Sequence, residues 1–252
     1  MNKLLILNYH AILSDKEEAI SDSFTLKFSQ FREQINWIEK SQIPVVNLTT
    51  WQKNRGASNT LSIALTFDDG FASDFELVLP ELMKRNIPAT FFPIVSKIGQ
   101  NGFLNWSQLQ EMHEKDFEIG SHGLSHKRLT SFSTVNLKEE IVHSKQIIEQ
   151  KLNHPVTLFS IPFGIYSQKL LRSLADHYTL VLTTRSILNT NDSSFLMHRF
   201  NCKNTHSFQE FQALILGNPQ ALRKRKIRSS LALRWNKING FLDLFTKKNQ
   251  VI

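Results

Sequence analysis

The sequence has almost no cysteine and no long apolar run. Its 252 residues include one cysteine, Cys202, which excludes an intramolecular disulfide and fits a reducing compartment. No stretch approaches the roughly 18 apolar residues of a membrane-spanning helix. The N-terminal run Leu4–Leu7 is shorter than the roughly 7–15 residues of a signal-peptide core, and no small-residue cleavage site follows it. We therefore expect a cytoplasmic protein. The sequence also contains no internal repeat and no low-complexity segment.

Apolar residues are nonetheless plentiful, and they follow two periods. They make up 41% of the chain, with 19 phenylalanines, which is enough for one large core. Short runs of strand-forming residues alternate with segments of helical spacing, an order that predicts an α/β fold with parallel strands. The expected strands are 4–9, 44–48, 61–69, 89–95, 117–121, 156–160, 178–183 and 195–200. The expected helices are 28–40, 73–86, 106–115, 134–152, 168–176 and 208–216.

One expected strand ends in two adjacent acids. Leu61-Ser-Ile-Ala-Leu-Thr-Phe-Asp-Asp-Gly70 delivers Asp68 and Asp69 to a surface, and Gly70 lets the chain turn away. Adjacent carboxylates are costly to ionise together, because like charges raise the pKa of one of them, and a metal ion would remove that cost. One carboxylate would then bind the metal and the other would act as a base. An Asp-Asp-Gly turn that caps the next helix has equal weight for this stretch taken alone.

A second expected strand ends in two histidines. Ile119-Gly-Ser-His-Gly-Leu-Ser-His126 places His122 and His126 four residues apart, and on one helical turn this spacing would bring both imidazoles to the same side. Such a pair is often incidental. Its place at a strand end, paired with the acids at another strand end, favours a site, because barrel active sites lie at the carboxyl ends of strands. Two histidines and one carboxylate suit a zinc-like divalent ion with open coordination positions.

These motifs resemble those of a known family. Thr66-Phe-Asp-Asp-Gly70 and Ser121-His-Gly-Leu-Ser-His126 are similar to the first two motifs of the polysaccharide deacetylases, the NodB-homology domain of carbohydrate esterase family 4. Further similarities are Asn8-Tyr-His10, Asn105-Trp106 and Ile161-Pro-Phe-Gly164, and the resemblance covers roughly residues 4 to 217. It implies a distorted (β/α) barrel of about seven parallel strands. It also implies hydrolysis of N-acetyl groups on amino sugars with the help of a divalent metal.

The resemblance implies a role for each motif residue. Asp69, His122 and His126 would bind the metal, in the first place Zn2+, with Co2+, Ni2+ or Fe2+ as alternatives. Asp68 would be the base that takes a proton from the attacking water, whose pKa the metal lowers. Four further residues would contact the substrate or its oxyanion: Pro162, Phe163, Gly164 and Trp106. The backbone N–H of Phe163 is the candidate hydrogen-bond donor to the oxyanion.

Departure of the amine requires a general acid, and two histidines are candidates. Leu196-Met-His198 resembles the Leu-x-His motif that supplies the acid in many members of the family. His10 resembles the early histidine of the biofilm poly-N-acetylglucosamine deacetylases. The N-terminal strand and the Ile-Pro-Phe-Gly loop are more similar to this subgroup, which suggests a role in exopolysaccharide biosynthesis. We therefore favour His10 over His198.

The chain departs from the family pattern in one important place. Many members carry an arginine just ahead of the Pro-aromatic-Gly loop, where it orients the base aspartate, whereas this chain has Ser160-Ile161. How Asp68 is held is therefore open at the level of sequence, and Arg199 and Arg185 are the candidates to replace the missing arginine. The family's Asp-x-x-Asp-Trp segment is not recognisable either.

The C-terminal segment 219–252 differs in composition from residues 1–218, which we expect to form the barrel domain. It contains nine lysines and arginines and one acid, Asp243, and so holds the whole net charge of +8. A basic amphipathic helix of this kind is typical of a membrane-surface anchor, and a helix that packs its apolar stripe on the barrel has equal weight. No aromatic-basic module indicates nucleic acid. The apolar stripe is Ile227, Leu231, Trp235, Ile238, Leu242 and Phe245.

Together these observations predict a metal-dependent de-N-acetylase that acts on an N-acetylated, GlcNAc-type amino sugar in a glycan or its precursor. The absence of a signal peptide favours an intracellular precursor, and membrane contact by residues 219–252 would favour a lipid-linked one at the inner membrane face. Two alternatives remain at this stage. One is another amide or imide hydrolase on the same scaffold, and the other is a non-catalytic glycan-binding relic, which the missing arginine favours.

Overall fold

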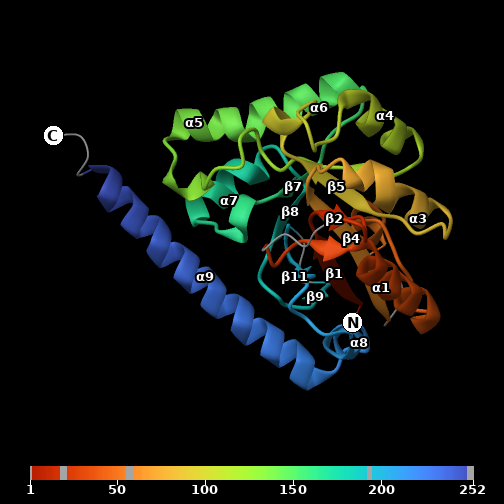
Figure 1. Ribbon diagram of the computed structural model, residues 1–252. Helices are drawn as coiled ribbons and strands as arrows, with labels where there is room; N and C mark the ends of the chain where they lie inside the picture. Colours follow the sequence, from red (N-terminus) through yellow and green to blue (C-terminus); the bar gives the residue numbers. More distant parts are fainter. Residues whose placement is uncertain (1, 18–21, 55–59, 192–194, 249–252) are drawn as a thin grey trace.

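The protein forms an α/β barrel with a long C-terminal helix beside it (Figure 1). The computed structural model describes residues 2–17, 22–54, 60–191 and 195–248, with the side chains of these residues except Thr134 and 234–248. The side chains of Trp235, Ile238, Leu242 and Phe245 in the expected apolar stripe therefore lie outside what the structure describes.

Two parallel sheets make up the barrel. One has the order β11-β1-β4-β5-β6 and the other the order β10-β8-β7. A bridge between Ser121 and Phe159 joins them on one side, and on the other side Arg199 alone separates β10 from β11. Since β10 and β11 share one place, the ring has seven places, as predicted. The strands are β1 Lys3–Tyr9, β4 Leu61–Asp69, β5 Thr90–Pro93, β6 Glu118–Ile119, β7 Leu158–Ser160, β8 Leu180–Thr183, β10 Leu196–His198 and β11 Phe200–Asn201.

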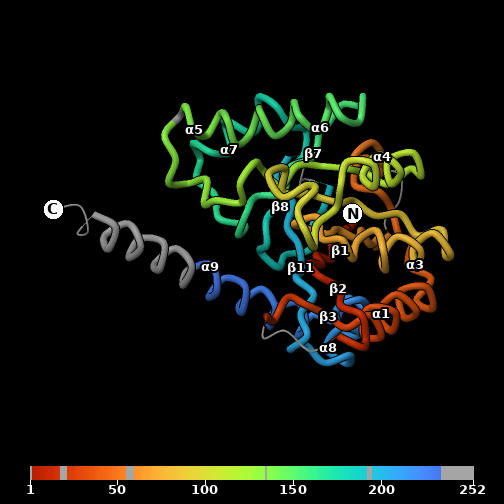
Figure 2. Tube along the Cα trace, turned by 45° about the horizontal axis from the view of Figure 1, so that its top comes forward, coloured from red at the N-terminus to blue at the C-terminus, as the bar shows by residue number. Residues whose placement is uncertain are grey.

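Helices surround the strands of the barrel (Figure 1), and further short strands lie beside them, of which β2 and β3 are labelled in Figure 2. β2 (Ile12–Leu13) pairs with β3 (Leu26–Lys27), and β9 (Asn189–Thr190) runs antiparallel to β1. Two π-helical turns interrupt the expected helices 73–86 and 134–152, at Asp74–Val78 and Glu139–His143. The helices are α1 Phe28–Ser41, α2 Leu48–Lys53, α3 Leu79–Met83, α4 Trp106–Glu114, α5 Thr134–Lys138, α6 Ser144–Leu152, α7 Gln168–Ala175, α8 Phe208–Ile215 and α9 Pro219–Lys248.

One expected strand is wrong. Residues 44–48 contribute only a bridge between Val45 and Ile63, and Leu48 already begins α2. The acid Glu118 explains the change, because its carboxylate accepts hydrogen bonds from the backbone N–H groups of Leu48 and Thr49 at 3.0 Å each. A negative charge at a helix N-terminus stabilises the helix. A residue 70 positions away therefore starts a helix where the local sequence favours a strand.

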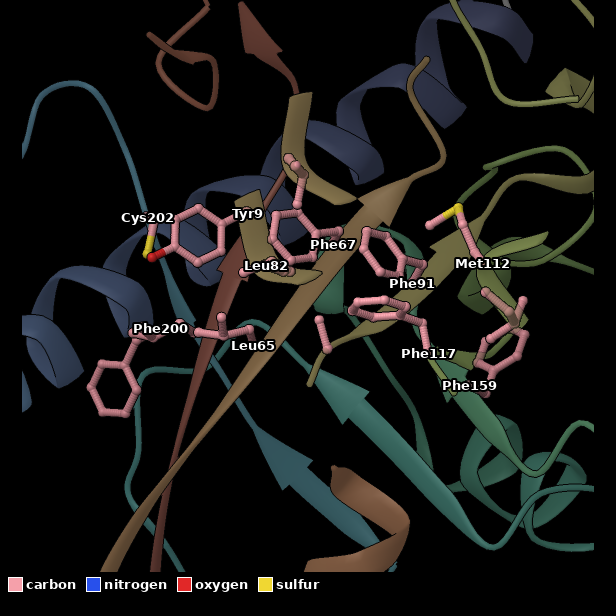
Figure 3. Close-up of a cluster of buried hydrophobic side chains, with 14 of the residues drawn as sticks. Tyr9, Leu65, Phe67, Leu82, Phe91, Met112, Phe117, Phe159, Phe200 and Cys202 are labelled. Atoms are coloured by element: carbon pink, nitrogen blue, oxygen red, sulfur yellow. The ribbon is translucent and has the colours of Figure 1, made fainter. Parts of the chain in front are cut away.

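The alternation of side chains along the strands separates two apolar clusters. The larger cluster lies between the strands and the helices, and in it Tyr9, Phe67 and Phe91 stack with ring centroids 5.2 and 4.9 Å apart (Figure 3). The smaller cluster includes Leu4, Ile6, Ala64, Phe92, Leu158, Leu180, Leu182 and Met197. Successive residues of a strand point to opposite faces, so this second set fills the barrel interior.

The same alternation turns polar residues inward at the carboxyl ends of the strands. Asn8 follows Leu4 and Ile6 by the period of two, and Asp68 follows Ala64 in the same way. Arg199 follows Met197, which is also an interior residue. The apolar filling of the barrel therefore ends in a layer of buried polar groups, all of which are at most 2% exposed.

Two glycines make the tight approach of the strand ends possible. Gly70 has φ +76°, and a Cβ atom there would lie 2.8 Å from Cβ of Pro93 in β5. Gly120 follows β6, and a Cβ atom there would lie 2.3 Å from the ring of Phe92. Both distances are shorter than atoms tolerate, so these positions require glycine where β4, β5 and β6 meet.

Candidate metal and catalytic site

A cavity of about 730 Å3 opens at the carboxyl ends of the barrel strands. Its wall on one side comes from β1, β4 and the loop after β6, and on the other side from residues 201–206 and α9. This is the face where parallel barrels build their active sites. The lining residues that the sequence predicted are His10, Asp68, Asp69, His122, His126 and Phe163.

Asp68 is buried and is held by Arg199. The two carboxylate oxygens of Asp68 accept hydrogen bonds from Nη1 and Nη2 of Arg199 at 2.8 and 2.7 Å, and Asn8 donates a third at 3.2 Å. Burial alone would raise the pKa of Asp68, but the Arg199 guanidinium, together with His122, outweighs burial and holds that pKa well below its usual range. Asp68 is therefore ionised at neutral pH and fixed in orientation.

Arg199 thus occupies the place of the missing motif arginine. Its side chain is fully buried, and besides Asp68 it donates to Oδ1 of Asn8 at 2.7 Å and to the hydroxyl of Ser160 at 2.7 Å. Ser160, with Ile161, stands where the family resemblance predicts the motif arginine. Of the two candidate replacements, the geometry selects Arg199, since the described residues that donate hydrogen bonds to the Asp68 carboxylate are Asn8 and Arg199.

Asp69, His122 and His126 form a cluster that suits a metal ion. One ligand atom from each residue lies within 4.8 Å of the others, and Oδ1 of Asp69 is 3.5 Å from Nε2 of His122 and 3.4 Å from Nε2 of His126. Nδ1 of His122 donates to the carbonyl oxygen of Ser160 at 2.8 Å, which leaves Nε2 with a free lone pair in the neutral imidazole.

One oxygen of this cluster lacks a hydrogen bond. Among the residues that the structure describes, none donates a hydrogen bond to Oδ1 of Asp69, which is buried. Burial raises the pKa of Asp69 to about 6, an effect that Asp68 reinforces and His122 opposes. Burial also lowers the pKa of His122 and of His126, so both imidazoles favour the neutral form. Two neutral imidazoles and a carboxylate without a hydrogen bond suit a divalent cation, because the cation would keep the carboxylate ionised.

The loop that carries the histidines is not a helical turn, contrary to the expectation from their spacing. Residues 122–127 have no helical structure, and His126 has φ +54°. Glu140, in the π-helical turn before α6, fixes this loop by accepting hydrogen bonds from the backbone N–H groups of Leu124 at 2.9 Å and Ser125 at 3.0 Å. The Ser125 hydroxyl also donates to Glu140. A buried acid outside the motif therefore sets the position of His126.

The structure brings one of the two candidate general acids to the cavity. His10 lines the cavity, its ring lies 4.7 Å from that of Phe24, and its Nδ1 is buried without a hydrogen-bond partner. Burial lowers the pKa of His10 to about 4, and Asp68 partly opposes the shift. His198 has the opposite orientation on β10 from the interior residue Met197, does not line the cavity, and shares a 2.8 Å hydrogen bond with Thr183 through Nδ1.

Of the four predicted substrate residues, one lines the cavity. Phe163 is 39% exposed, has φ +61°, and its ring centroid lies 4.7 Å from that of His126. Pro162 and Gly164 are buried and shape the turn that presents Phe163. Trp106 begins α4, packs against the core, lies 5.9 Å from Nζ of Lys151, and does not line the cavity.

Sequence reasoning missed the contribution of α9 to the site. Arg225, Arg228, Ser229, Ala232 and Leu233 line the cavity, although the sequence analysis assigned this helix to a separate segment. Two backbone contacts attach α9 to the barrel, from Arg225 to the carbonyl oxygen of Asn201 at 3.2 Å and from the backbone N–H of Ser186 to the Ser229 hydroxyl at 3.0 Å. The basic amphipathic pattern of this helix does not by itself indicate that it lines a cavity.

Several known proteins are similar to this chain in sequence or fold. The chain is similar to YxkH of Bacillus subtilis, at 25% identity over 84% of this chain and 76% of YxkH. It is also similar to a poly-beta-1,6-N-acetyl-D-glucosamine N-deacetylase of Staphylococcus epidermidis, at 27% identity over 69% of each chain. A solved polysaccharide deacetylase from Bacillus cereus shares the fold, with a TM-score of 0.75 and 23% identity over 84% of this chain and 69% of that one. The polysaccharide deacetylase family model matches residues 55–180, and the chain belongs to this family.

Proposed function

We propose that the protein is a metal-dependent de-N-acetylase that removes acetyl groups from a GlcNAc-type amino sugar in a glycan or glycan precursor. The observation that carries this proposal is the position of an ionised, arginine-held carboxylate, Asp68, beside the cluster Asp69, His122 and His126 in one cavity. The name of the Staphylococcus epidermidis relative, which acts on poly-beta-1,6-N-acetyl-D-glucosamine, supports the substrate class.

The cluster would hold a divalent cation, and two histidines with one carboxylate favour Zn2+. When bound, such a cation polarises the amide carbonyl and lowers the pKa of water. Asp68 is the base in this proposal. Arg199 keeps Asp68 ionised and fixes its oxygens, so the carboxylate is ready to take a proton from water at neutral pH.

The departing amine must gain one proton for each proton that water gives up. His10 is the histidine that lines the cavity and is the proposed carrier of that proton to the amine nitrogen. Burial keeps His10 neutral at rest, so His10 would take up a proton from solvent through the cavity and deliver it to the amine nitrogen, while Asp68 would release to solvent the proton it took from the attacking water. The backbone N–H of Phe163 is the proposed donor to the oxyanion, because Phe163 lines the cavity next to His126.

The two alternative functions differ from this proposal in what they require. The non-catalytic alternative depended on the absence of an arginine for Asp68, and the pairing of Asp68 with Arg199 argues against it. An amide or imide hydrolase of other specificity would keep the same cluster and base. The substrate therefore has to be decided by assay.

The first test measures metal content and acetate release together. The purified full-length protein is expected to hold about one divalent ion per chain, and a variant with His122→Ala and His126→Ala is expected to lose it. His177→Ala is the matched control, because His177 is exposed and follows the C-terminal end of α7. Acetate release from β-1,6-linked or β-1,4-linked GlcNAc oligomers, lost in Asp68→Asn, supports the proposal. A metal-loaded protein that releases no acetate from any N-acetylated sugar contradicts it.

We also propose that α9 contacts an anionic membrane surface. Ile227 and Leu231 are 51% and 59% exposed and lie one helical turn apart, beside the exposed basic residues Arg223, Lys224 and Lys226. One of the two interpretations of the sequence required the apolar stripe to pack on the barrel. Ile227 and Leu231 are instead largely exposed. Each basic residue near an anionic leaflet contributes about 1 kcal/mol, and the exposed apolar pair adds insertion of its side chains. No described helix is long and apolar enough to cross a membrane.

Vesicle sedimentation tests this contact. The full-length protein is expected to sediment with vesicles that contain anionic lipid at low salt, and to remain in solution with neutral vesicles or at high salt. A variant with Ile227→Ser and Leu231→Ser should sediment less, whereas Val135→Ser, at another exposed apolar position on α5, should behave as the wild type. Equal sedimentation of both variants, or none of the wild type, argues against the contact.

A further inference from the structure

A buried cation without an acidic partner lines the cavity on the side of α9. Arg225 is 7% exposed, and the ion pairs of the described residues include none for it. Its hydrogen-bond partners are neutral: the carbonyl oxygen of Asn201 at 3.2 Å and Nδ1 of His206 at 2.7 Å. Burial lowers the pKa of His206 to about 3, and Arg225 adds to the shift, so this histidine carries no charge that could compensate the arginine.

A buried charge in a protein is normally paired or bound to a ligand, because removal of an ion from water costs several kcal/mol. Among the residues that the structure describes, Arg225 has no acid within ion-pair distance, and Glu210 acts on it only from farther away. The same wall of the cavity adds two further cations, Lys203 and Arg228. Arg228 is exposed and pairs with the half-buried Glu210 at 3.3 Å, and Lys203 lies near Asp22.

This cationic wall is connected to the catalytic carboxylate by a short chain of contacts. Asn8 donates one hydrogen bond to Asp68 at 3.2 Å and another to the side chain of Asn201 at 3.0 Å. The backbone carbonyl of Asn201 in turn accepts from Arg225. Arg225 is thus two residues removed from the proposed base, within the same cavity.

We infer that Arg225 and Arg228, with Lys203, form a subsite for a phosphate group carried by the sugar substrate. Arg225 and Arg228 are three residues apart on one face of α9, and both line the cavity. A single guanidinium satisfies the two oxygens of a carboxylate, whereas two guanidiniums and an ammonium match the several oxygens of a phosphate. This inference deepens the proposed function and rests on it for the acetylated part of the substrate.

The subsite leaves two sources for the phosphate. It could belong to a soluble sugar phosphate or to the phosphate that joins a glycan to a lipid carrier. The exposed Ile227 and Leu231 lie on the same helix as Arg225, so a lipid-linked substrate would meet the membrane-facing and cavity-facing sides of α9 together. The chemistry that Arg225 recognises is the same for both sources.

The test compares binding of GlcNAc-1-phosphate with binding of GlcNAc by titration calorimetry on the full-length protein. We expect the phosphate to improve the affinity by about tenfold or more, which corresponds to about 1.4 kcal/mol. The preference should persist when a chelator is present, since it does not come from phosphate bound to a metal. Equal affinity for the two sugars in the wild type would overturn the inference.

Substitutions on one helix supply the controls. Arg228→Gln and Arg225→Gln should each reduce the preference for the phosphate, whereas Arg223→Gln, an exposed position outside the cavity, should leave it unchanged. Arg225→Lys keeps the charge if the glutamine variant fails to fold, and should retain part of the preference. A preference that is undiminished in Arg225→Gln, or in Arg225→Lys combined with Arg228→Gln, overturns the assignment of these residues.

A third arm identifies the source of the phosphate and separates the two proposals. Tighter binding of a polyprenyl ester of GlcNAc-1-phosphate in detergent assigns the subsite to a lipid-linked substrate, and equal binding assigns it to a soluble sugar phosphate. These measurements record binding, so they do not depend on turnover. Phosphate preference without acetate release would refute the proposed function alone, and acetate release from neutral oligomers without phosphate preference would refute the subsite alone.

Discussion

Replacement of Arg199 with methionine is expected to impair both folding and catalysis. Arg199 is fully buried, makes two hydrogen bonds to the carboxylate of Asp68, and also bonds Asn8 and Ser160. Methionine has a similar length but no charge, so the substitution leaves the Asp68 carboxylate buried and unpaired. Loss of one partner of a buried ion pair costs about 3–5 kcal/mol. For a chain of this size, that corresponds to a fall in Tm of about 6–20 °C.

The catalytic effect follows from the pKa of Asp68. In the wild type, Arg199 counteracts burial and holds this pKa well below its usual range, so Asp68 stays ionised across the neutral range. Without Arg199, burial is opposed mainly by His122, and the pKa rises above the ordinary aspartate value. Acetate release in Arg199→Met should therefore fall by about 10²–10⁴ at neutral pH, and kcat/KM should recover as the pH rises. The wild type should show no such acid limb from Asp68 above pH about 4.

Two further variants separate this reasoning from general damage to the fold. Arg185→Met removes the other candidate arginine and should leave the pH profile unchanged, since the Asp68 carboxylate is bonded by Asn8 and Arg199. The double variant Asp68→Asn with Arg199→Met should be more stable than the sum of the single effects predicts, by about 2 kcal/mol, because neither group is left charged alone. A Tm of Arg199→Met within about 2 °C of the wild type, or an unshifted pH profile, would refute the reasoning.

Three other outcomes follow from the site. His10→Ala should lower kcat by about 10²–10⁴, whereas His198→Ala should keep kcat near the wild-type value, because only His10 lines the cavity; equal losses in acetate release would contradict this. Glu140→Gln should weaken metal affinity by about 10–100-fold in a chelator competition, since Glu140 holds the loop of His126 through the backbone of Leu124; unchanged affinity would show that the loop holds itself. Burial lowers the pKa of His10 and His198 to about 4 and of His206 to about 3, so these groups stabilise the fold above pH about 6.5 and lose that contribution as pH falls toward 4. Urea unfolding should therefore show lower stability at pH 5 than at pH 7, although Asp69, whose pKa burial raises to about 6, opposes the trend; higher stability at pH 5 would mean that the acids dominate.

The strands and the acids at their ends could be predicted because neighbouring residues in the sequence determine them. The run from Leu61 to Asp69 is apolar enough to be a buried strand, and Gly70 marks the turn that follows it. The histidine spacing predicted a cluster correctly for the wrong reason. The loop of His126 is not helical, and its shape depends on Glu140, which lies outside the motif and has no local sequence mark.

Elements that depend on distant partners were not predictable in this way. Leu48 begins a helix because Glu118 accepts hydrogen bonds from that helix's N-terminus. The role of α9 in the cavity depends on the contact of Arg225 with Asn201, 24 positions away. Composition described this helix as basic and amphipathic, and that description is equally true of a helix far from any site.

The arginine of Asp68 shows why a motif can be lost without loss of the interaction it serves. The barrel is a ring, so the interior above Asp68 can be reached from β7, where Ser160 lies, or from the junction of β10 and β11, where Arg199 lies. Ser160 is small enough to leave room, and its hydroxyl accepts a hydrogen bond from the same Arg199 guanidinium at 2.7 Å. The buried Asp68 carboxylate needs a cationic partner that reaches it from an interior position of this layer, and period-two alternation decides which residues qualify. Arg199 satisfies this condition because it follows the interior residue Met197 by two, whereas His198 between them does not.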